Sequence, residues 1–359
     1  MQNTTHSLTK ATLILAAAIA LLLSLPACQK CETLEQVVTP PPARCGGAFY
    51  ALKSESGVNL AFSLHEFAKP VPEPFASVSK AGPFGVPTML GFIRSNFSAY
   101  DSTSRRYVYW HYYGTGDQFF SFNAGSGLPT LTPGPRIDVC PVFHKGRLHT
   151  IYAEQFSASE WFYSINEVNP ITGLDGVGLI GNSATTNSPL RPEYMSAVST
   201  GGDLFYFLSG TNLIEVNLNA NTSRHIDIDR SYHPIDNIVQ YFGLEYKRDE
   251  GVLLAMRNTN NATTGEVKTT LVSIRVTSGD PVVTTLFDIS AGLPAGPERF
   301  VNPEFYSSAF DPCDNTYYAT SKRGLEIITT RFIEVNLPKN EMKQRVLDGY
   351  WYGLEFAGR

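Results

Sequence analysis

The sequence predicts an all-β protein, a β-propeller of six four-stranded blades, and three observations lead to this prediction. An aromatic-Gly-Leu-Glu-aromatic motif at 242–246 returns at 352–356. A pattern of short strands and polar turns repeats with a period of roughly 45–60 residues, which is typical of propellers. The composition, with 12% aromatic and 17% charged residues among 359, is that of a β-rich globular chain.

The first two strands of each unit are predicted to form a hairpin. An apolar residue ends one strand, a polar turn follows, and an apolar residue seven positions after the first lies in the next strand. A polar turn between two apolar runs indicates a β-hairpin. The four segments with this spacing are 100–107, 198–205, 246–253 and 310–317, and 142–148 is a shorter version.

The third and fourth strands follow each hairpin. The segment Leu-Ile-Glu-Val-Asn-Leu-Asn at 213–219 matches Phe-Ile-Glu-Val-Asn-Leu-Pro at 332–338, and a turn residue ends each copy. A further strand, such as 282–287, comes next. Units are therefore expected to begin near positions 97, 141, 195, 243 and 304.

The two ends of the domain are expected to complete one blade together. Segments 47–52 and 58–64 resemble second and third strands with no first strand before them, whereas 350–356 resembles a first strand with nothing after it. Pairing them closes the ring, because an open ring would leave two apolar faces unpaired. This gives six blades, and seven if residues 66–95 contain another partial unit.

The N-terminal segment 1–27 is interpreted as an export signal. Lys10 precedes an apolar run at 11–23, which is too short to span a bilayer comfortably. Leu25-Pro26-Ala27-Cys28 resembles the bacterial lipobox, in which Cys28 would carry the lipid; the alternative is an ordinary signal peptide cut after Ala27. Gln29 favours the outer membrane, with the protein facing the periplasm or the cell surface.

The rest of the chain is divided into a Pro-rich tether at 28–45 and a propeller domain at 46–359. The net charge of −5 argues against nucleic acid as a partner, since the sequence has no basic stripe to displace phosphate counterions. Export permits disulfides. From the blade positions we expect Cys45–Cys313 or Cys31–Cys313, with Cys140 buried and free.

Two carboxylates are the candidate metal ligands. Glu245 and Glu355 occupy equivalent places on innermost strands, where they could bind Ca²⁺ in the channel; the alternative is hydrogen bonding to neighbouring groups. The other units carry alanine at this place (Ala99, Ala197 and Ala309), so no full ligand set is predicted and no other cofactor is expected. Asp101 and Asp311 each begin a hairpin turn and are expected to cap it.

The most aromatic stretch, 107–113, includes Trp110, His111 and Tyr112, which could stack on a ligand or fill the space between blades. Together with the periodicity and the Ile-Glu-Val-Asn-Leu texture, the chain over 46–359 resembles exported six-bladed propeller lipoproteins common in Bacteroidetes-like bacteria. Some six-bladed relatives are calcium-dependent lactonases or sugar-acid hydrolases, whose ligands find no residue-by-residue match here.

Three functions follow as hypotheses. The first, which the missing ligand set favours, is a non-catalytic module that binds a protein or glycan while a lipid anchors it to the membrane. The second is a calcium-dependent, lactonase-like hydrolase at the mouth of the channel. The third is a structural component of an envelope complex.

Overall fold

The computed structural model describes residues 46–54, 61–85, 97–111, 118–133, 139–157, 159–185, 190, 195–229, 237–261, 264–294, 301–302, 306–322 and 329–358. The predicted signal, Cys28, the tether, Cys31 and Cys45 lie outside these residues. Within the described part of the chain, no helix is long and apolar enough to cross a membrane.

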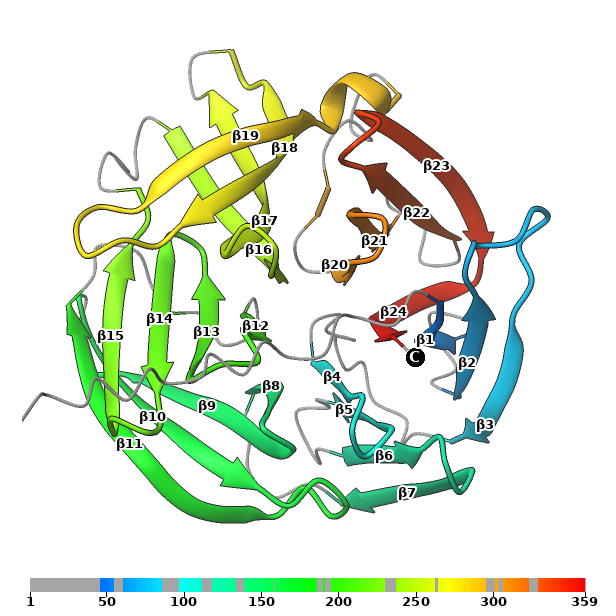
Figure 1. Ribbon diagram of the computed structural model, residues 1–359, viewed down its shortest axis with the longest axis horizontal. Helices are drawn as coiled ribbons and strands as arrows, with labels where there is room; N and C mark the ends of the chain where they lie inside the picture. Colours follow the sequence, from blue (N-terminus) through cyan, green and yellow to red (C-terminus); the bar gives the residue numbers. More distant parts are fainter. Residues whose placement is uncertain are drawn as a thin grey trace, which may run out of the picture. The chain divides into compact units, whose positions relative to one another are not determined.

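The described strands form six four-stranded antiparallel sheets arranged as the blades of a ring (Figure 1). From the axis outward, blade 1 contains β24 (Tyr350–Gly358), β1 (Gly47–Ser54), β2 (Phe62–Ala68) and β3 (Val78–Phe84). Blade 2 contains β4 (Ser98–Asp101), β5 (Arg106–His111), β6 (Gln118–Asn123) and β7 (Leu128–Pro133). Blade 3 contains β8 (Val139–His144), β9 (Arg147–Gln155), β10 (Glu160–Val168) and β11 (Asp175–Thr185).

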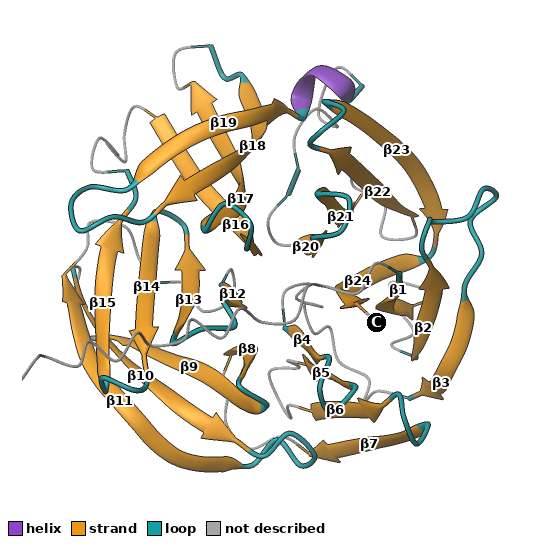
Figure 2. Cartoon of the chain, viewed as in Figure 1, coloured by secondary structure: helices purple, strands orange, loops and turns teal. Residues whose placement is uncertain are grey.

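The second half of the ring repeats this order. Blade 4 contains β12 (Ser196–Ser199), β13 (Leu204–Ser209), β14 (Asn212–Asn217) and β15 (Thr222–Asp227). Blade 5 contains β16 (Asn237–Lys247), β17 (Val252–Asn261), β18 (Val267–Arg275) and β19 (Val282–Asp288). Blade 6 contains β20 (Tyr306–Asp311), β21 (Thr316–Lys322), β22 (Thr329–Asn336) and β23 (Glu341–Asp348). Regular structure in the described residues is otherwise limited to one helical turn, η2 (Ser290–Gly292) (Figure 2).

The six-bladed prediction is confirmed. Residues 78–84, part of the stretch that could have held a seventh unit, form the outer strand of blade 1. The expected third strand at 58–64 is placed too early, because β2 begins at Phe62.

The predicted closure of the ring is also confirmed. The C-terminal strand β24 pairs antiparallel with β1, with Phe49 opposite Phe356 and Ser54 opposite Tyr350. Strand β1 therefore has hydrogen-bonded neighbours on both sides, β24 and β2. The pairing of the two ends of the domain therefore leaves no unpaired strand edge where the ring closes.

The core lies between neighbouring blades, because the central strands bury side chains on both faces. Phe49 of blade 1 shows the arrangement: its ring lies 4.6 Å from that of Tyr318 in blade 6 and 5.2 Å from that of Phe356 in its own blade. Removing such a ring from water stabilises the fold by roughly 1.5–3 kcal/mol. The outermost strands, by contrast, are largely exposed.

The hairpin turns are capped as predicted. Asp101 accepts hydrogen bonds from the backbone N–H groups of Thr103 and Ser104, at 3.2 and 2.9 Å. Asp311 accepts one from Cys313 at 2.9 Å and also pairs with Lys69 of blade 1. The second aspartate therefore joins blades 6 and 1 as well as capping its own turn.

Candidate functional site

The innermost strands β16 and β24 both contain a bulge at their Gly-Leu pair. In β16, Phe242 pairs with Met256 and Glu245 pairs with Leu254. The two residues between them, 243 and 244, therefore lie opposite the single residue 255. In β24 the same irregularity lies opposite residue 51. Gly243 and Gly353 have φ of +66° and +61°, which favours glycine. A Cβ atom added to Gly243 would lie 2.2 Å from the ring of Tyr306. One added to Gly353 would lie 2.4 Å from the hydroxyl of Tyr107.

Each bulge hydrogen-bonds to the blade that follows it. Tyr317 Oη of blade 6 donates to the carbonyl oxygen of Gly243 at 2.6 Å. Tyr107 Oη of blade 2 donates to that of Gly353 at 2.7 Å. Both tyrosines lie in second strands and are fully buried. The bulges thus turn backbone carbonyls toward the next blade.

Each bulge also hydrogen-bonds to the blade before it. The backbone N–H of Leu244 donates to Ser196 Oγ of blade 4 at 3.0 Å, and that of Leu354 donates to Ser307 Oγ of blade 6 at 3.1 Å. The Gly-Leu-Glu motif is therefore a connector that ties three consecutive blades together around the axis.

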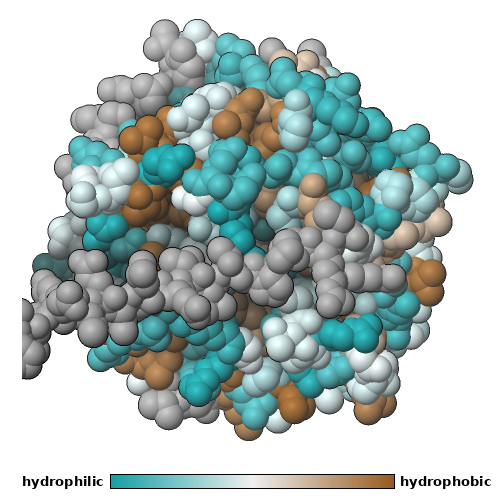
Figure 3. All heavy atoms as spheres, viewed as in Figure 1, coloured by the Kyte–Doolittle hydropathy of each residue, from teal (hydrophilic) through white to brown (hydrophobic). Residues whose placement is uncertain are grey.

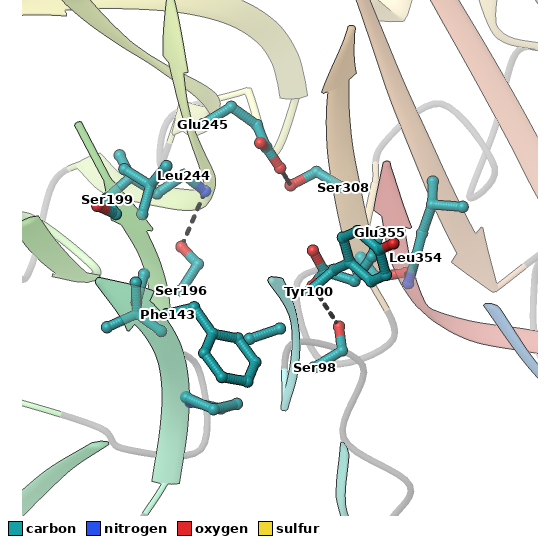
Figure 4. A pocket seen from close by; sticks show the side chains of 16 residues that line it. Ser98, Tyr100, Phe143, Ser196, Ser199, Leu244, Glu245, Ser308, Leu354 and Glu355 are labelled. Atoms are coloured by element: carbon teal, nitrogen blue, oxygen red, sulfur yellow. Dashed lines mark hydrogen bonds between the residues drawn. The ribbon is translucent and has the colours of Figure 1, made fainter. Parts of the chain in front are cut away.

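The glutamate of each motif points into an axial cavity. Ser308 Oγ donates to Glu245 Oε1, and Ser98 Oγ donates to Glu355 Oε1, both at 2.7 Å (Figure 4). The cavity measures about 200 Å³, and all six innermost strands line it. Both carboxyl groups thus share one small space while each is held by a serine of the following blade.

Burial changes the ionisation of these two groups. Removal from solvent raises the pKa of Glu245 to about 7, against the opposing effect of its hydrogen bond from Ser308. The pKa of Glu355 rises to about 8 because burial is reinforced by the charge of Glu245. Near neutral pH both groups hold a proton for part of the time, so the cavity contains groups able to accept or donate one.

The two glutamates were the predicted metal ligands. Among the described residues, no group of three or more His, Cys, Asp or Glu side chains is placed to hold a metal ion. Ca²⁺ usually takes six to eight oxygen ligands, and here each carboxylate is already hydrogen-bonded to a serine. A calcium site at Glu245 and Glu355 stays a prediction.

The aromatic candidates lie in the interior. Trp110 and His111 are each 3% exposed. The Trp110 ring lies 4.3 Å from that of Phe119, and His111 lies 4.1 Å from Phe62 of blade 1. Their burial agrees with the packing alternative, and stacking on a ligand stays a prediction. Tyr112 lies outside the described residues.

The cysteines are placed only in part. Cys140 is buried and free, as expected, and burial with the nearby charge of Glu355 raises the pKa of its thiol. Cys313 is half-buried in the first turn of blade 6. Because Cys31 and Cys45 lie outside the described residues, the disulfide stays a prediction.

Two larger cavities, not expected from the sequence, open between blades. One of about 630 Å³ lies between blades 1 and 2, around Tyr50 and Tyr100. The other, of about 470 Å³, lies between blades 4 and 5, around Tyr206 and Tyr246. Both are lined by turns that join first and second strands, so they open on the same face of the ring. The hairpin spacing makes Tyr100 and Tyr246 equivalent, but it does not reveal which side chains of the preceding blade face them.

The face drawn in Figure 3 is mixed in character. Hydrophilic side chains cover much of the part of this face that is described, and apolar ones lie in smaller groups between them (Figure 3). The large exposed apolar side chains are dispersed over outer strands and peripheral turns, as at Val78, Leu128 and Val282.

Comparison with solved structures finds several proteins to which this chain is similar. TolB from Acinetobacter baumannii superposes with a TM-score of 0.56 at 10% identity, covering 87% of this chain and 67% of TolB. The allergen Mala s 1 of Malassezia sympodialis gives 0.42 at 10% identity, covering 74% and 83%. Oligogalacturonate lyase from Vibrio parahaemolyticus gives 0.39 at 10% identity, covering 85% and 79%.

At 10% identity, the TolB likeness establishes the propeller fold alone. No protein-family model matches the chain, and no curated protein sequence matches it.

Proposed function

We propose that this protein is a non-catalytic binding module, exported and held at the outer membrane through a lipid on Cys28. The ring acts as a rigid support whose inter-blade grooves meet a protein or glycan partner. The apolar run at 11–23 and the lipobox-like segment ending at Cys28 support the address. The propeller fold, which this chain shares with TolB, is consistent with a rigid ring that presents binding surfaces.

The distribution of open space carries the proposal. The axial cavity is small, and its two carboxylates are hydrogen-bonded to serines. Among the described residues, larger spaces lie at the two grooves on the turn face, each lined by tyrosines and polar side chains. A ligand held there would lie away from the two glutamates with raised pKa values, so binding is favoured over chemistry.

The lipid anchor is tested in a bacterial host that expresses the full chain and is fed a labelled fatty acid. We expect the label on the wild-type protein and its recovery with membranes. Cys28→Ala should lose both, whereas Cys31→Ala, three residues away, should keep both. Label retained by Cys28→Ala would contradict the anchor.

The binding role is tested with the mature protein as bait, on detergent-solubilised membranes and on a glycan array. We expect a partner or a glycan to be captured and recovered with unchanged mass. A stoichiometric complex that persists through purification would favour the structural role instead. Cleavage or isomerisation of a captured glycan would overturn the non-catalytic assignment.

A hydrolase is the second candidate, because two carboxyl groups with pKa values near neutrality share one cavity. A Ca²⁺ site occupied at 100 times its dissociation constant would stabilise the fold by about 2.7 kcal/mol. If the protein is a binding module without a calcium site, adding CaCl₂ should leave its melting temperature unchanged. A clear rise that Glu245→Gln or Glu355→Gln abolishes would favour the hydrolase.

A further inference from the structure

The groove between blades 1 and 2 contains an unusual backbone conformation at Arg105. This residue ends the first turn of blade 2 with φ of +55°, a left-handed conformation that most side chains disfavour. The register of the hairpins makes Gly251 its equivalent in blade 5 and Asn315 its equivalent in blade 6. These are residue types that tolerate the conformation. An arginine here accepts a backbone conformation whose cost a Gly or Asn would reduce.

The Arg105 side chain is exposed at the groove and lies beside its two tyrosines. Its positive charge and a hydrogen bond partly offset the burial that raises the pKa of Tyr100. Among the described residues no carboxylate pairs with Arg105. The groove's other cation, Lys80, lies 3.3 Å from Glu66 Oε2. Arg105 is therefore the cation available to a ligand.

Two stacked tyrosine rings lie next to the Arg105 guanidinium. The rings of Tyr50 and Tyr100 stack with centroids 5.5 Å apart at 21°, and Tyr100 is half-buried, so part of it faces the groove. Tyr50 Oη donates to Glu66 Oε2 at 2.7 Å, which fixes the carboxylate at the edge of the stack. Ser102 adds an exposed hydroxyl.

From this arrangement we infer that the groove between blades 1 and 2 binds a carboxylate-bearing sugar unit of an acidic glycan. Aromatic rings receive the C–H face of a sugar, while Glu66, Lys80 and Ser102 can hydrogen-bond its hydroxyls. The guanidinium of Arg105 can grip a carboxylate through two parallel hydrogen bonds. The inference rests on the proposed function, since it names one ligand class of the binding module.

A peptide fits this place less well. One common mode of peptide binding adds a strand to a free sheet edge, and β1, which contributes Tyr50 to the groove, is hydrogen-bonded on both sides. Among the described residues that line the groove, Arg105 is the one cation that no carboxylate pairs with, and it lies beside one aromatic stack. A small ring with one negative charge matches these features.

The groove between blades 4 and 5 provides an internal comparison. Tyr206 Oη donates to Glu215 Oε2 at 2.9 Å, and Arg224 pairs with Glu215 at 3.1 Å, as Lys80 does with Glu66. Its turn, however, has Gly251 where blade 2 has Arg105. The tyrosine-glutamate-cation arrangement thus recurs in the blade that precedes each groove, but Glu215 and Arg224 do not line the second groove, which also has no counterpart of Arg105.

The test is calorimetric titration of the mature protein with methyl glucuronide, its neutral counterpart methyl glucoside, and N-acetyltyrosine as a peptide-like carboxylate. We expect the glucuronide to bind at least tenfold more tightly than either of the others. Arg105→Asn should lose this affinity at least tenfold while its melting temperature stays equal or rises, because asparagine suits the conformation. Arg248→Asn, in the equivalent turn of blade 5, should bind like the wild type.

Equal affinity of the wild type and Arg105→Asn for the glucuronide would overturn the inference, as would a wild type that does not bind it. Preference for N-acetyltyrosine would point to a peptide carboxylate and overturn the sugar assignment. In each of these cases, capture of another glycan or of a protein partner would leave the proposed function standing. Chemical conversion of the glucuronide would instead overturn the non-catalytic role.

Discussion

The hydroxyl of Tyr107 lies 2.7 Å from the carbonyl oxygen of Gly353, to which it donates a hydrogen bond. Tyr107 belongs to the second strand of blade 2, and Gly353 to the strand that closes blade 1. The contact works only because residue 353 has no side chain: a Cβ atom there would lie 2.4 Å from the same hydroxyl.

Gly353→Ala should therefore destabilise the fold by about 2–4 kcal/mol, since a left-handed backbone and a steric clash act together. Urea unfolding followed by tryptophan fluorescence measures the loss. Gly127→Ala is the matched control, because φ is +71° but nothing lies within 4 Å of the added atom. Equal losses in the two variants would show that the contact with Tyr107 is unimportant.

Removing the hydroxyl alone gives a second expectation. Tyr107→Phe keeps the packing of the ring but leaves the Gly353 carbonyl without this donor, at a cost of about 1–3 kcal/mol. Tyr317→Phe should cost at least as much, because its hydroxyl donates to Gly243 in the equivalent place and also hydrogen-bonds the hydroxyl of Tyr306. Thermal or urea unfolding of both single variants checks this, and no loss in either would mean that another donor replaces the tyrosine.

Glu355 should make the fold less stable as pH rises. Its pKa is about 8 when folded and near 4.5 when exposed, so between these values the folded chain holds a proton that the unfolded chain has lost. Stability attributed to this group is therefore complete below pH 4.5 and lost as pH rises through 8. Glu355→Gln removes that dependence.

We expect the melting temperature of Glu355→Gln relative to wild type to be higher at pH 8.5 than at pH 5, by about 2 °C or more. Scanning calorimetry at the two pH values measures the difference. Glu66→Gln serves as a comparison, because Glu66 lies outside the axial cavity. A gap between Glu355→Gln and wild type that does not change with pH would contradict the raised pKa.

The buried histidines should make the fold less stable as pH falls, opposite to the effect of Glu355. Burial lowers the pKa of His111 to about 3 and that of His144 to about 4. Both are neutral in the folded chain at pH values where the unfolded chain is protonated, so their contribution is lost as pH falls below 6.5. His111→Phe, which can pack beside Phe62 and Tyr109, should lose less melting temperature between pH 6.5 and 4 than wild type. A parallel decline in both would contradict this expectation.

The aspartate caps allow a matched comparison. Asp311 is fully buried and pairs with Lys69, whereas Asp101 caps an equivalent turn. Asp311→Asn keeps an acceptor for the turn but leaves the Lys69 charge with the longer contact to Asp314 and the ring of Phe356. We expect a loss of about 2–4 kcal/mol, and a smaller one for Asp101→Asn. Urea unfolding of both variants measures the two losses in the free energy of unfolding. Equal losses would mean that the turn caps, and not the pair with Lys69, account for the effect.

The sequence was sufficient for the architecture because the repeated unit is local. The hairpin spacing and the returning Gly-Leu-Glu motif lie within single blades, so they predicted six sheets and the pairing of β24 with β1. Boundaries were less accurate, as at the start of β2, because the apolar alternation that begins at Val58 runs on through Phe62 and does not mark the first paired residue.

The sites were harder to predict because their partners come from other blades. Glu245 and Glu355 were placed on the axis correctly, but Ser308 and Ser98, which hold them, lie in following blades. Arg105 was missed for the same reason: its importance depends on Tyr50 and Glu66, which lie some 40–55 residues earlier in another sheet. A positive φ at an arginine leaves no trace in the hydrophobic pattern.

The pairing of β24 with β1 also orders events in time. The two strands that meet in blade 1 are separated by nearly the whole domain, so their partnership cannot form until almost all of it has left the ribosome. Contacts this distant along a chain are slow to establish. Until β24 is available, blade 1 lacks its innermost strand, so an incomplete chain should expose an unpaired edge on β1.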